Sequence, residues 1–200
     1  MIRYVAFLRA INVGGHIVKM DVLKKSFVHL GFKDVDTFIA SGNVLFSSRS
    51  RDTAKLERQI EAQLRKDLGY EVATFVRTAQ EVVAVAAYQA FPPKAVEAAV
   101  SHNVGFLSAA LTAEGQTALQ KLASAIDVFH TNEREWYWLS HGRQSESAIS
   151  NAAIERALKV RSTLRGMNTI IRLAGRLQQK VDSPTPAGRA AKATRPTRKR

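Results

Sequence analysis

The sequence predicts an α+β protein made of two diverged halves that share one order of elements, βαββαβ. Short strand patterns alternate with amphipathic helix patterns over residues 1–78. The motif VAFLRA at residues 5–10 returns as VGFLSA at residues 104–109. Because similar elements follow each motif in the same order, the sequence indicates an internal duplication. This order is that of the ferredoxin-like fold, so we expect two ferredoxin-like halves with additional helices.

The first half opens with a strand and a helix. Residues 2–9 are rich in β-branched and aromatic side chains, which favour a buried strand. A helix is predicted over residues 20–30, where an apolar stripe runs through Met20, Leu23, Phe27 and Leu30. Gly31 followed by Phe32 is typical of a helix end.

Two more strands, a helix and a fourth strand complete the first half. The two strands flank a turn at residues 41–43, Ser-Gly-Asn, whose residue types suit a hairpin. Asp52 is expected to cap a helix that ends at Gly69. The segment YEVATFVR at residues 70–77 is then the fourth strand.

An additional helix and a linker separate the halves. A capping box of Thr78 and Glu81 opens the helix, and a Pro-Pro pair stops it. Residues 92–101 are predicted to be a linker. We therefore expect a first half at residues 1–91 and a second half at residues 102–182.

The second half repeats the element order. After its first strand we expect a helix, a hairpin and a helix, at residues 112–123, 126–140 and 148–158. A short extended piece at residues 161–163 takes the place of the fourth strand. The last helix is expected to have Asn168 as its N-cap.

Both faces of the predicted sheets are apolar. Phe7 and Leu8 point to opposite faces of the first strand. In the late hairpin, Trp136 and Trp138 share one face and Tyr137 takes the other. Because its own helices cover only one face of such a sheet, we expect the other half to cover the second face. The tryptophans are then expected to pack in the core and not to stack on nucleic-acid bases.

Composition places the chain among globular proteins. Hydrophobic residues make up 46% of its 200 residues, which is enough for a core without covalent support. The absence of cysteine excludes disulfides, cysteine-based zinc sites and thiol nucleophiles. No apolar run approaches the roughly 20 residues that span a bilayer, and no signal-peptide cleavage pattern follows the N-terminal segment. We therefore expect a soluble cytoplasmic protein with no membrane contact.

The formal net charge of +13 is unevenly spread, because a short C-terminal tail is strongly basic. Residues 183–200 contain six Lys or Arg residues and no acidic residue, whereas the rest of the chain has 24 basic residues against 17 acidic ones. The tail lacks large apolar side chains, so it is expected to be disordered. Two interpretations are open: non-specific contact with nucleic acid through counterion release, or a solubilising tail without a dedicated partner.

The loop after the first strand is the first candidate site. Asn12, Gly14 and Gly15 tolerate left-handed backbone conformations, which let successive N–H groups turn toward an anion. Arg9 and Lys19 would add positive charge. The spacing matches neither a Walker loop nor a dinucleotide fingerprint. The alternative is a plain connection that needs conformational freedom.

Two further polar clusters are candidates for the same site. The hairpin turn contributes Ser41 and Asn43, although hairpin chemistry alone also explains them. The other cluster combines arginines with hydroxyl groups beside a helix start, which suits phosphate or carboxylate: Arg161, Thr163, Arg165, Asn168 and Thr169. If the clusters converge, a site between the halves is expected.

Recognisable catalytic and metal-binding patterns are missing from the sequence. The histidines do not have metal-ligand spacing, and no G-x-S-x-G motif or pair of carboxylates stands out. We therefore expect no metal and no cofactor, and we identify no catalytic residue.

Three stretches of the chain resemble a known family. The stretches YVAFLRAINVGG, TFIASGNVLF and RSTLRGMNT resemble the bacterial "domain of unknown function 1697" family over residues 1–177. The chain differs from the family pattern at Met167, where the pattern has tryptophan, and at residues 142–147, which lack the lysine of a Gly-Arg-Ser-Lys-like stretch. The resemblance implies a fold of paired α/β plaits and leaves the function open.

These observations lead to three hypotheses for function. The first is a non-enzymatic protein that binds a small anionic ligand or a nucleic-acid backbone at a basic cleft between its halves. The second is an enzyme that acts on a phosphorylated or carboxylated metabolite at the same cleft. The third is a module that binds a partner protein without a small ligand.

Overall fold

The computed structural model of the protein describes residues 1–9, 11, 18–39, 42–142 and 149–179. Within these ranges the chain is an α+β protein with two four-stranded antiparallel sheets and seven helices. Part of what the sequence predicts lies outside the described residues, namely the basic tail and the candidate residues Asn12, Gly14, Gly15 and Ser41.

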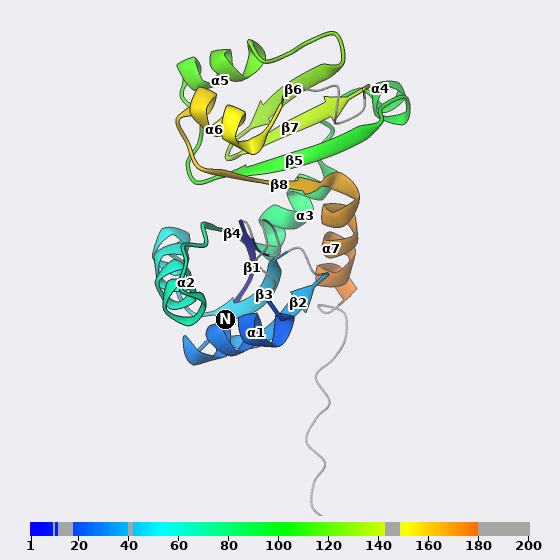
Figure 1. Cartoon of the computed structure of the whole chain (residues 1–200). Coiled ribbons are helices and arrows are strands. Elements are labelled where there is room, and N and C mark those ends of the chain that lie inside the picture. Colours follow the sequence, from blue (N-terminus) through cyan, green and yellow to red (C-terminus); the bar gives the residue numbers. More distant parts are fainter. Residues whose placement is uncertain (10, 12–17, 40–41, 143–148, 180–200) are drawn as a thin grey trace, which may run out of the picture.

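The first sheet carries its two helices on one face (Figure 1). Its half consists of β1 (Ile2–Leu8), α1 (Met20–His29), β2 (Lys33–Phe38), β3 (Asn43–Ser48), α2 (Thr53–Leu68) and β4 (Thr74–Thr78). The strand order is β2-β3-β1-β4, with all neighbours antiparallel. Apolar stripes on α1 and α2 pack on this sheet, with Phe27 and Ile60 completely buried. Gly69 ends α2 with φ at 81°, the left-handed conformation expected of it.

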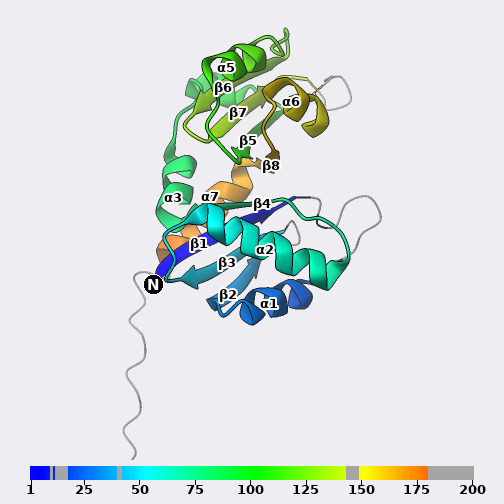
Figure 2. The ribbon, with the colours of Figure 1, turned by 90° about the vertical axis from the view of Figure 1, so that its left-hand side faces the viewer.

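The second half has the same strand order. Two helices, α3 (Ala79–Ala87) and α4 (Pro93–Glu97), precede it. Its elements are β5 (Ser101–Leu107), α5 (Ala113–Gln120), β6 (Asp127–Asn132), β7 (Glu135–Ser140), α6 (Asn151–Leu158), β8 (Ser162–Gly166) and α7 (Met167–Gln179). Its strands are ordered β6-β7-β5-β8 and are antiparallel. Helices α5 and α6 lie on the far side of this sheet from the first half (Figures 1 and 2).

The inner faces of the two sheets share one hydrophobic core. Helices α3 and α7 pack against each other and lie between the sheets (Figure 1). At the centre, Phe7 of β1 stacks on Phe106 of β5 with ring centroids 3.9 Å apart and planes 10° apart. Val5 and Phe75 from the first sheet join Tyr137 from the second in the same core. The second face of each sheet is thus covered partly by the other half, as expected, and partly by helices α3 and α7.

The tryptophans of β7 are buried, as expected. Trp136 is completely buried and its indole N–H donates to Ser162 Oγ at 2.9 Å. Trp138 is 3% exposed and donates to Asp127 Oδ1 at 2.7 Å. With both indole N–H groups satisfied inside the protein, neither ring is presented for stacking on a base.

The structure corrects several element boundaries. Strand β8 continues to Gly166 and α7 begins at Met167, so Asn168 lies in the first turn of that helix and not at its N-cap. Strand β4 begins only at Thr74, the residue where its pairing with β1 starts. Residues 92–101, predicted to be a linker, contain the short helix α4.

Candidate ligand pocket between the two halves

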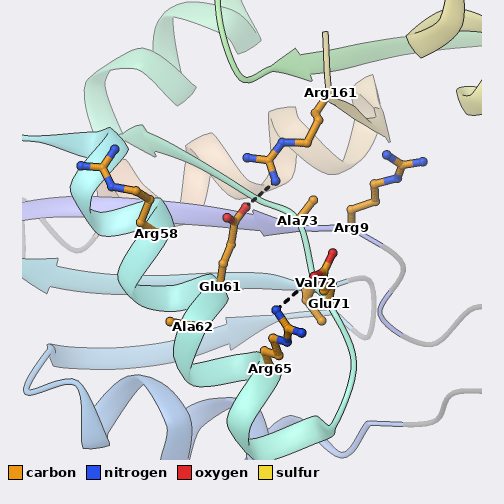
Figure 3. Close-up of a pocket in the computed structure, with 9 residues that line it drawn as sticks. All are labelled: Arg9, Arg58, Glu61, Ala62, Arg65, Glu71, Val72, Ala73 and Arg161. Carbon is orange, nitrogen blue, oxygen red and sulfur yellow. Dashed lines mark hydrogen bonds and ion pairs between the residues drawn. The ribbon is translucent and has the colours of Figure 1, made fainter.

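A hollow of about 620 Å³ lies where α2 faces the end of β1 and the start of β8 (Figure 3). Both halves of the chain line it. The lining residues are Arg9, Arg58, Glu61, Ala62, Arg65, Glu71, Val72, Ala73 and Arg161. Arg9 and Arg161, which the sequence places in separate clusters, therefore lie at one pocket.

The local fold of α2 explains why its charges face this pocket. Its apolar positions, among them Ile60 and Leu64, are buried against the sheet. Arg58, Glu61 and Arg65 are three and four residues apart and therefore share another face of the helix. This face lies opposite the segment that carries Arg161 (Figure 3).

Three of the four arginines that line the pocket form ion pairs. Arg161 donates to Glu61 Oε1 at 2.9 Å, which joins the second half to the first. Arg65 lies 3.3 Å from Glu71 Oε1. Arg9 reaches in the opposite direction and pairs with Glu155 on α6. Each of these carboxylates thus neutralises one guanidinium near the cavity.

Arg58 differs from the other three arginines. Its side chain is exposed, and it makes no hydrogen bond or ion pair with any residue in the described part of the chain. In Figure 3, dashed lines join Arg161 to Glu61 and Arg65 to Glu71. Among the residues that the structure describes, Arg58 is therefore a cation at the pocket without an anionic partner.

Glu61 and Glu155, which pair with arginines of the opposite half, also accept backbone hydrogen bonds at the edge strands of the two sheets. Strand β4 is an edge strand, and the backbone N–H of Thr74 donates to Glu61 Oε1 at 3.0 Å. In the second half, the N–H of Ser162 at the edge strand β8 donates to Glu155 at 2.6 Å. Each carboxylate thus binds one edge amide of its own half and one arginine of the opposite half.

Glu57, another carboxylate on α2, also accepts a backbone hydrogen bond from the edge strand β4. Glu57 Oε1 accepts the N–H of Val76 at 2.8 Å. Burial raises the pKa of Glu57 above its ordinary value, while the hydrogen bond from Val76 and the charge of Arg77 oppose this shift.

Arg165 lies inside the contact between the halves and not at the pocket. It donates to Asn43 Oδ1, Thr163 Oγ1 and two backbone carbonyls, those of Leu8 and Leu164, at 2.8 to 2.9 Å. All four acceptors are uncharged. Burial lowers the pKa of Arg165 to about 10. The structure thus brings Asn43, Thr163 and Arg165 together in a buried network.

A second buried arginine, Arg77 on β4, was not predicted from the sequence. It donates to Glu135 Oε1 at 2.6 Å and to the carbonyl of Leu107 at 2.9 Å. Burial lowers the pKa of Arg77 and raises that of Glu135. The sequence contains a signal for Arg77. The strand sequences TFVR at residues 74–77 and STLR at residues 162–165 both end in arginine, so Arg77 matches Arg165.

The remaining candidates lie apart from the described lining of the pocket. Lys19 is exposed at the start of α1, where its side chain makes no cap hydrogen bond. Asn168 is exposed and Thr169 half-buried in the first turn of α7.

In the part of the chain that the structure describes, no three His, Asp or Glu side chains gather in a way that could hold a metal ion. No helix in the same part of the chain has both the length and the apolar character needed to cross a bilayer.

The comparisons with known proteins define the family. The chain belongs to the family described as "Protein of unknown function (DUF1697)", whose model matches residues 1–137, and the resemblance noted in the sequence is confirmed. Among solved structures, the chain is similar to a conserved bacterial protein from Streptococcus pneumoniae. The two share 22% sequence identity over 88% of this chain and 98% of the other, with a TM-score of 0.68. At this identity the likeness shows the fold alone. No curated protein matches the sequence.

Proposed function

We propose that this protein binds a small organic anion in the pocket between its two halves. The observation that carries the proposal is Arg58, a guanidinium at a cavity of ligand size with no partner among the described residues. Four arginines and two glutamates line the pocket, a net formal charge of +2. A cavity with a net positive charge attracts anionic ligands.

The pocket also supplies an apolar surface. Val72 is buried, and the methyl groups of Ala62 and Ala73 face the same hollow. Pockets of a few hundred Å³ with apolar walls and a few charged groups are typical of small-molecule sites. We infer a ligand with an organic body and an anionic group.

Two observations favour this ligand over the alternatives. The inner faces of both sheets are covered and the β7 tryptophans are buried, so the sheets offer no platform for bases. The described lining residues carry no hydroxyl, imidazole or amine group, and the two carboxylates among them already bind arginines, Glu61 pairing with Arg161 and Glu71 with Arg65. Binding is therefore the better-supported role, and an enzyme acting on the same class of ligand is the alternative.

We further infer that each half is a ferredoxin-like unit and that the halves arose by duplication. The support is the shared strand order and the matching roles of Glu61 and Glu155. The paired motifs at residues 5–10 and 104–109 agree with this origin. The proposed pocket then lies at the junction that such a duplication creates.

A thermal-shift experiment on the full chain tests the proposed function. The probes are inorganic phosphate, glycerol 3-phosphate, succinate and lactate, with glycerol as the uncharged control, at low ionic strength. A ligand that binds only the folded state raises the melting temperature with its concentration. We expect at least one anion to raise it while glycerol has no effect.

Two variants locate the binding site. Arg58→Ala removes the unpaired cation and is expected to abolish the anion-dependent shift. Lys66→Ala is the matched control, because Lys66 is exposed on the same helix but does not line the pocket. The proposal fails if no anion stabilises the wild-type protein, or if both variants respond like the wild type.

A further inference from the structure

We propose that the pocket selects ligands with two negative charges on one small molecule, and that such a ligand binds by drawing Arg161 away from Glu61. This inference rests on the proposed function and names the class of ligand. The shared chemistry is an organic dianion, either a phosphomonoester or a dicarboxylate.

The charge pattern of the pocket carries the argument. Arg65 is neutralised by Glu71 and Arg9 by Glu155, whereas Arg58 has no anionic partner within the described ranges. A monoanion would satisfy Arg58 alone and gain nothing from its neighbours. A dianion has a second negative charge that can bind a second arginine. Its affinity is therefore higher if the ion pair of that arginine opens easily.

Two ion pairs at the pocket are exposed enough to open, that of Arg65 with Glu71 and that of Arg161 with Glu61, and Glu61 of the second pair lies within one turn of Arg58 on α2. The Arg161 side chain is 52% exposed, and exposed ion pairs are weak because water and salt screen them. A phosphate or carboxylate held by two guanidinium groups makes stronger, charge-assisted hydrogen bonds. The exchange is therefore favourable for a dianion.

Glu61 has a second partner that makes the exchange less costly. Its Oε1 also accepts the backbone N–H of Thr74. When Arg161 leaves, the carboxylate keeps this hydrogen bond and its contact with water, since the side chain is 24% exposed. No buried charge is left uncompensated, which is the usual penalty for breaking an ion pair.

The exchange also links the two halves through the ligand. Arg58 belongs to α2 of the first half, and Arg161 immediately precedes β8 of the second. An anion held by both replaces the direct contact between Arg161 and Glu61 with a bridge of its own. Val72 and Ala73 then face the organic body of the ligand.

Calorimetric titration of the full chain at pH 8 tests this inference. Glycerol 3-phosphate and succinate are the dianions, since a phosphomonoester loses its second proton near pH 6. Lactate is the monoanion. We expect the better dianion to bind about tenfold or more tightly than lactate, the gain typical of one more hydrogen bond to a charged group.

The decisive variant is Glu61→Gln. Glutamine keeps an oxygen for the Thr74 N–H but removes the charge that holds Arg161. Because exposed pairs are weak, we expect dianion affinity to rise about two- to fivefold, with lactate affinity unchanged. Glu97→Gln is the matched control, because Glu97 is exposed on α4 and does not line the pocket. Arg161→Ala is expected to abolish the preference for dianions.

The outcomes separate this inference from the proposed function. If none of the probes binds, both the selection of dianions and the proposed function are overturned. Binding that depends on Arg58 but is equal for lactate and the dianions overturns only the selection of dianions. Unchanged or weaker dianion affinity in Glu61→Gln overturns the exchange at Arg161. The relative affinities of glycerol 3-phosphate and succinate assign the ligand to phosphate or dicarboxylate chemistry.

Discussion

Arg77 and Arg165 occupy equivalent positions in the two halves of the molecule. Arg77 is opposite Val5 in the pairing of β4 with β1, and Arg165 is opposite Val104 in the pairing of β8 with β5. Each guanidinium crosses to the other half and donates to a strand carbonyl there, at 2.9 and 2.8 Å. Each also lies over a phenylalanine of the stacked central pair. The two arginines differ in their side-chain partners, which are the carboxylate of Glu135 for Arg77 and the uncharged groups of Asn43 and Thr163 for Arg165.

Because one set of partners is charged and the other is not, we expect different losses in the free energy of unfolding when each arginine is removed. Arg77→Ala leaves the buried carboxylate of Glu135 without its cation, which typically costs about 3–5 kcal/mol. Arg165→Ala leaves only uncharged groups, such as Asn43, without a donor, at about 1–3 kcal/mol. Urea unfolding of both variants measures the difference in free energy of unfolding.

A double variant checks the cause. Glu135→Gln removes the stranded charge, so adding it to Arg77→Ala is expected to recover part of the lost stability. Equal losses for the two single variants, or no recovery in the double variant, would show that charge burial is not what separates them.

The edge carboxylate Glu57 predicts a pH dependence of stability. Burial raises the pKa of Glu57 in the folded state above its ordinary value of 4.5. The folded state thus binds a proton more tightly than the unfolded state does. The contribution of this group is fully present below the ordinary pKa and is lost as the pH rises through the raised value.

Comparison of the Glu57→Gln variant with the wild type measures the contribution of Glu57 to the pH dependence of stability. Glutamine does not titrate but still accepts the N–H of Val76. The free energy of unfolding of the variant, minus that of the wild type, is expected to increase between pH 4 and pH 8. Urea titrations at several pH values measure it, with Glu97→Gln at an exposed site as the control. A difference that is constant, or that falls with pH, contradicts the assignment.

Much of the fold was predictable from the sequence because local patterns encode it. The apolar stripes of α1 and α2, the glycine that ends α2 and the two-sided apolar strands all depend on short-range spacing. The sequence left open whether the polar clusters converge, and the structure brings two of their residues, Arg9 and Arg161, to one pocket.

The rest of the pocket depends on packing that spacing does not encode. Arg58 and Arg65 have the pattern of solvated charges on a helix face, and only the docking of the second half places Arg161 opposite them. Arg165 fits a ligand-binding pattern equally well in sequence. The structure surrounds it with Asn43, Thr163 and backbone carbonyls, because its strand lies inside the contact between the halves.

Close packing in the second sheet makes Gly105 a sensitive position. A Cβ atom there would lie 1.9 Å from Nε1 of the buried Trp136. Gly105→Ala is therefore expected to destabilise the protein by about 3 kcal/mol, as overpacked cores do. Gly175→Ala is the control, since nothing lies within 4 Å of the added atom in α7 and alanine favours a helix by about 1 kcal/mol. Thermal unfolding is expected to show opposite signs for the two variants, and equal signs would contradict the packing argument.

The basic tail predicts salt-dependent contact with nucleic acid. Residues 183–200 contain six Lys or Arg residues and no acid, and each phosphate neutralised on duplex DNA lowers the slope of log affinity against log salt by about 0.9. We expect the full chain to bind a duplex of arbitrary sequence at low salt, and a chain ending at Asp182 to lose up to about 5 from that slope. Fluorescence anisotropy over a salt series measures both slopes. If the full chain does not bind at low salt, or if the two slopes are the same, the tail is not a nucleic-acid contact and its charge serves only solubility.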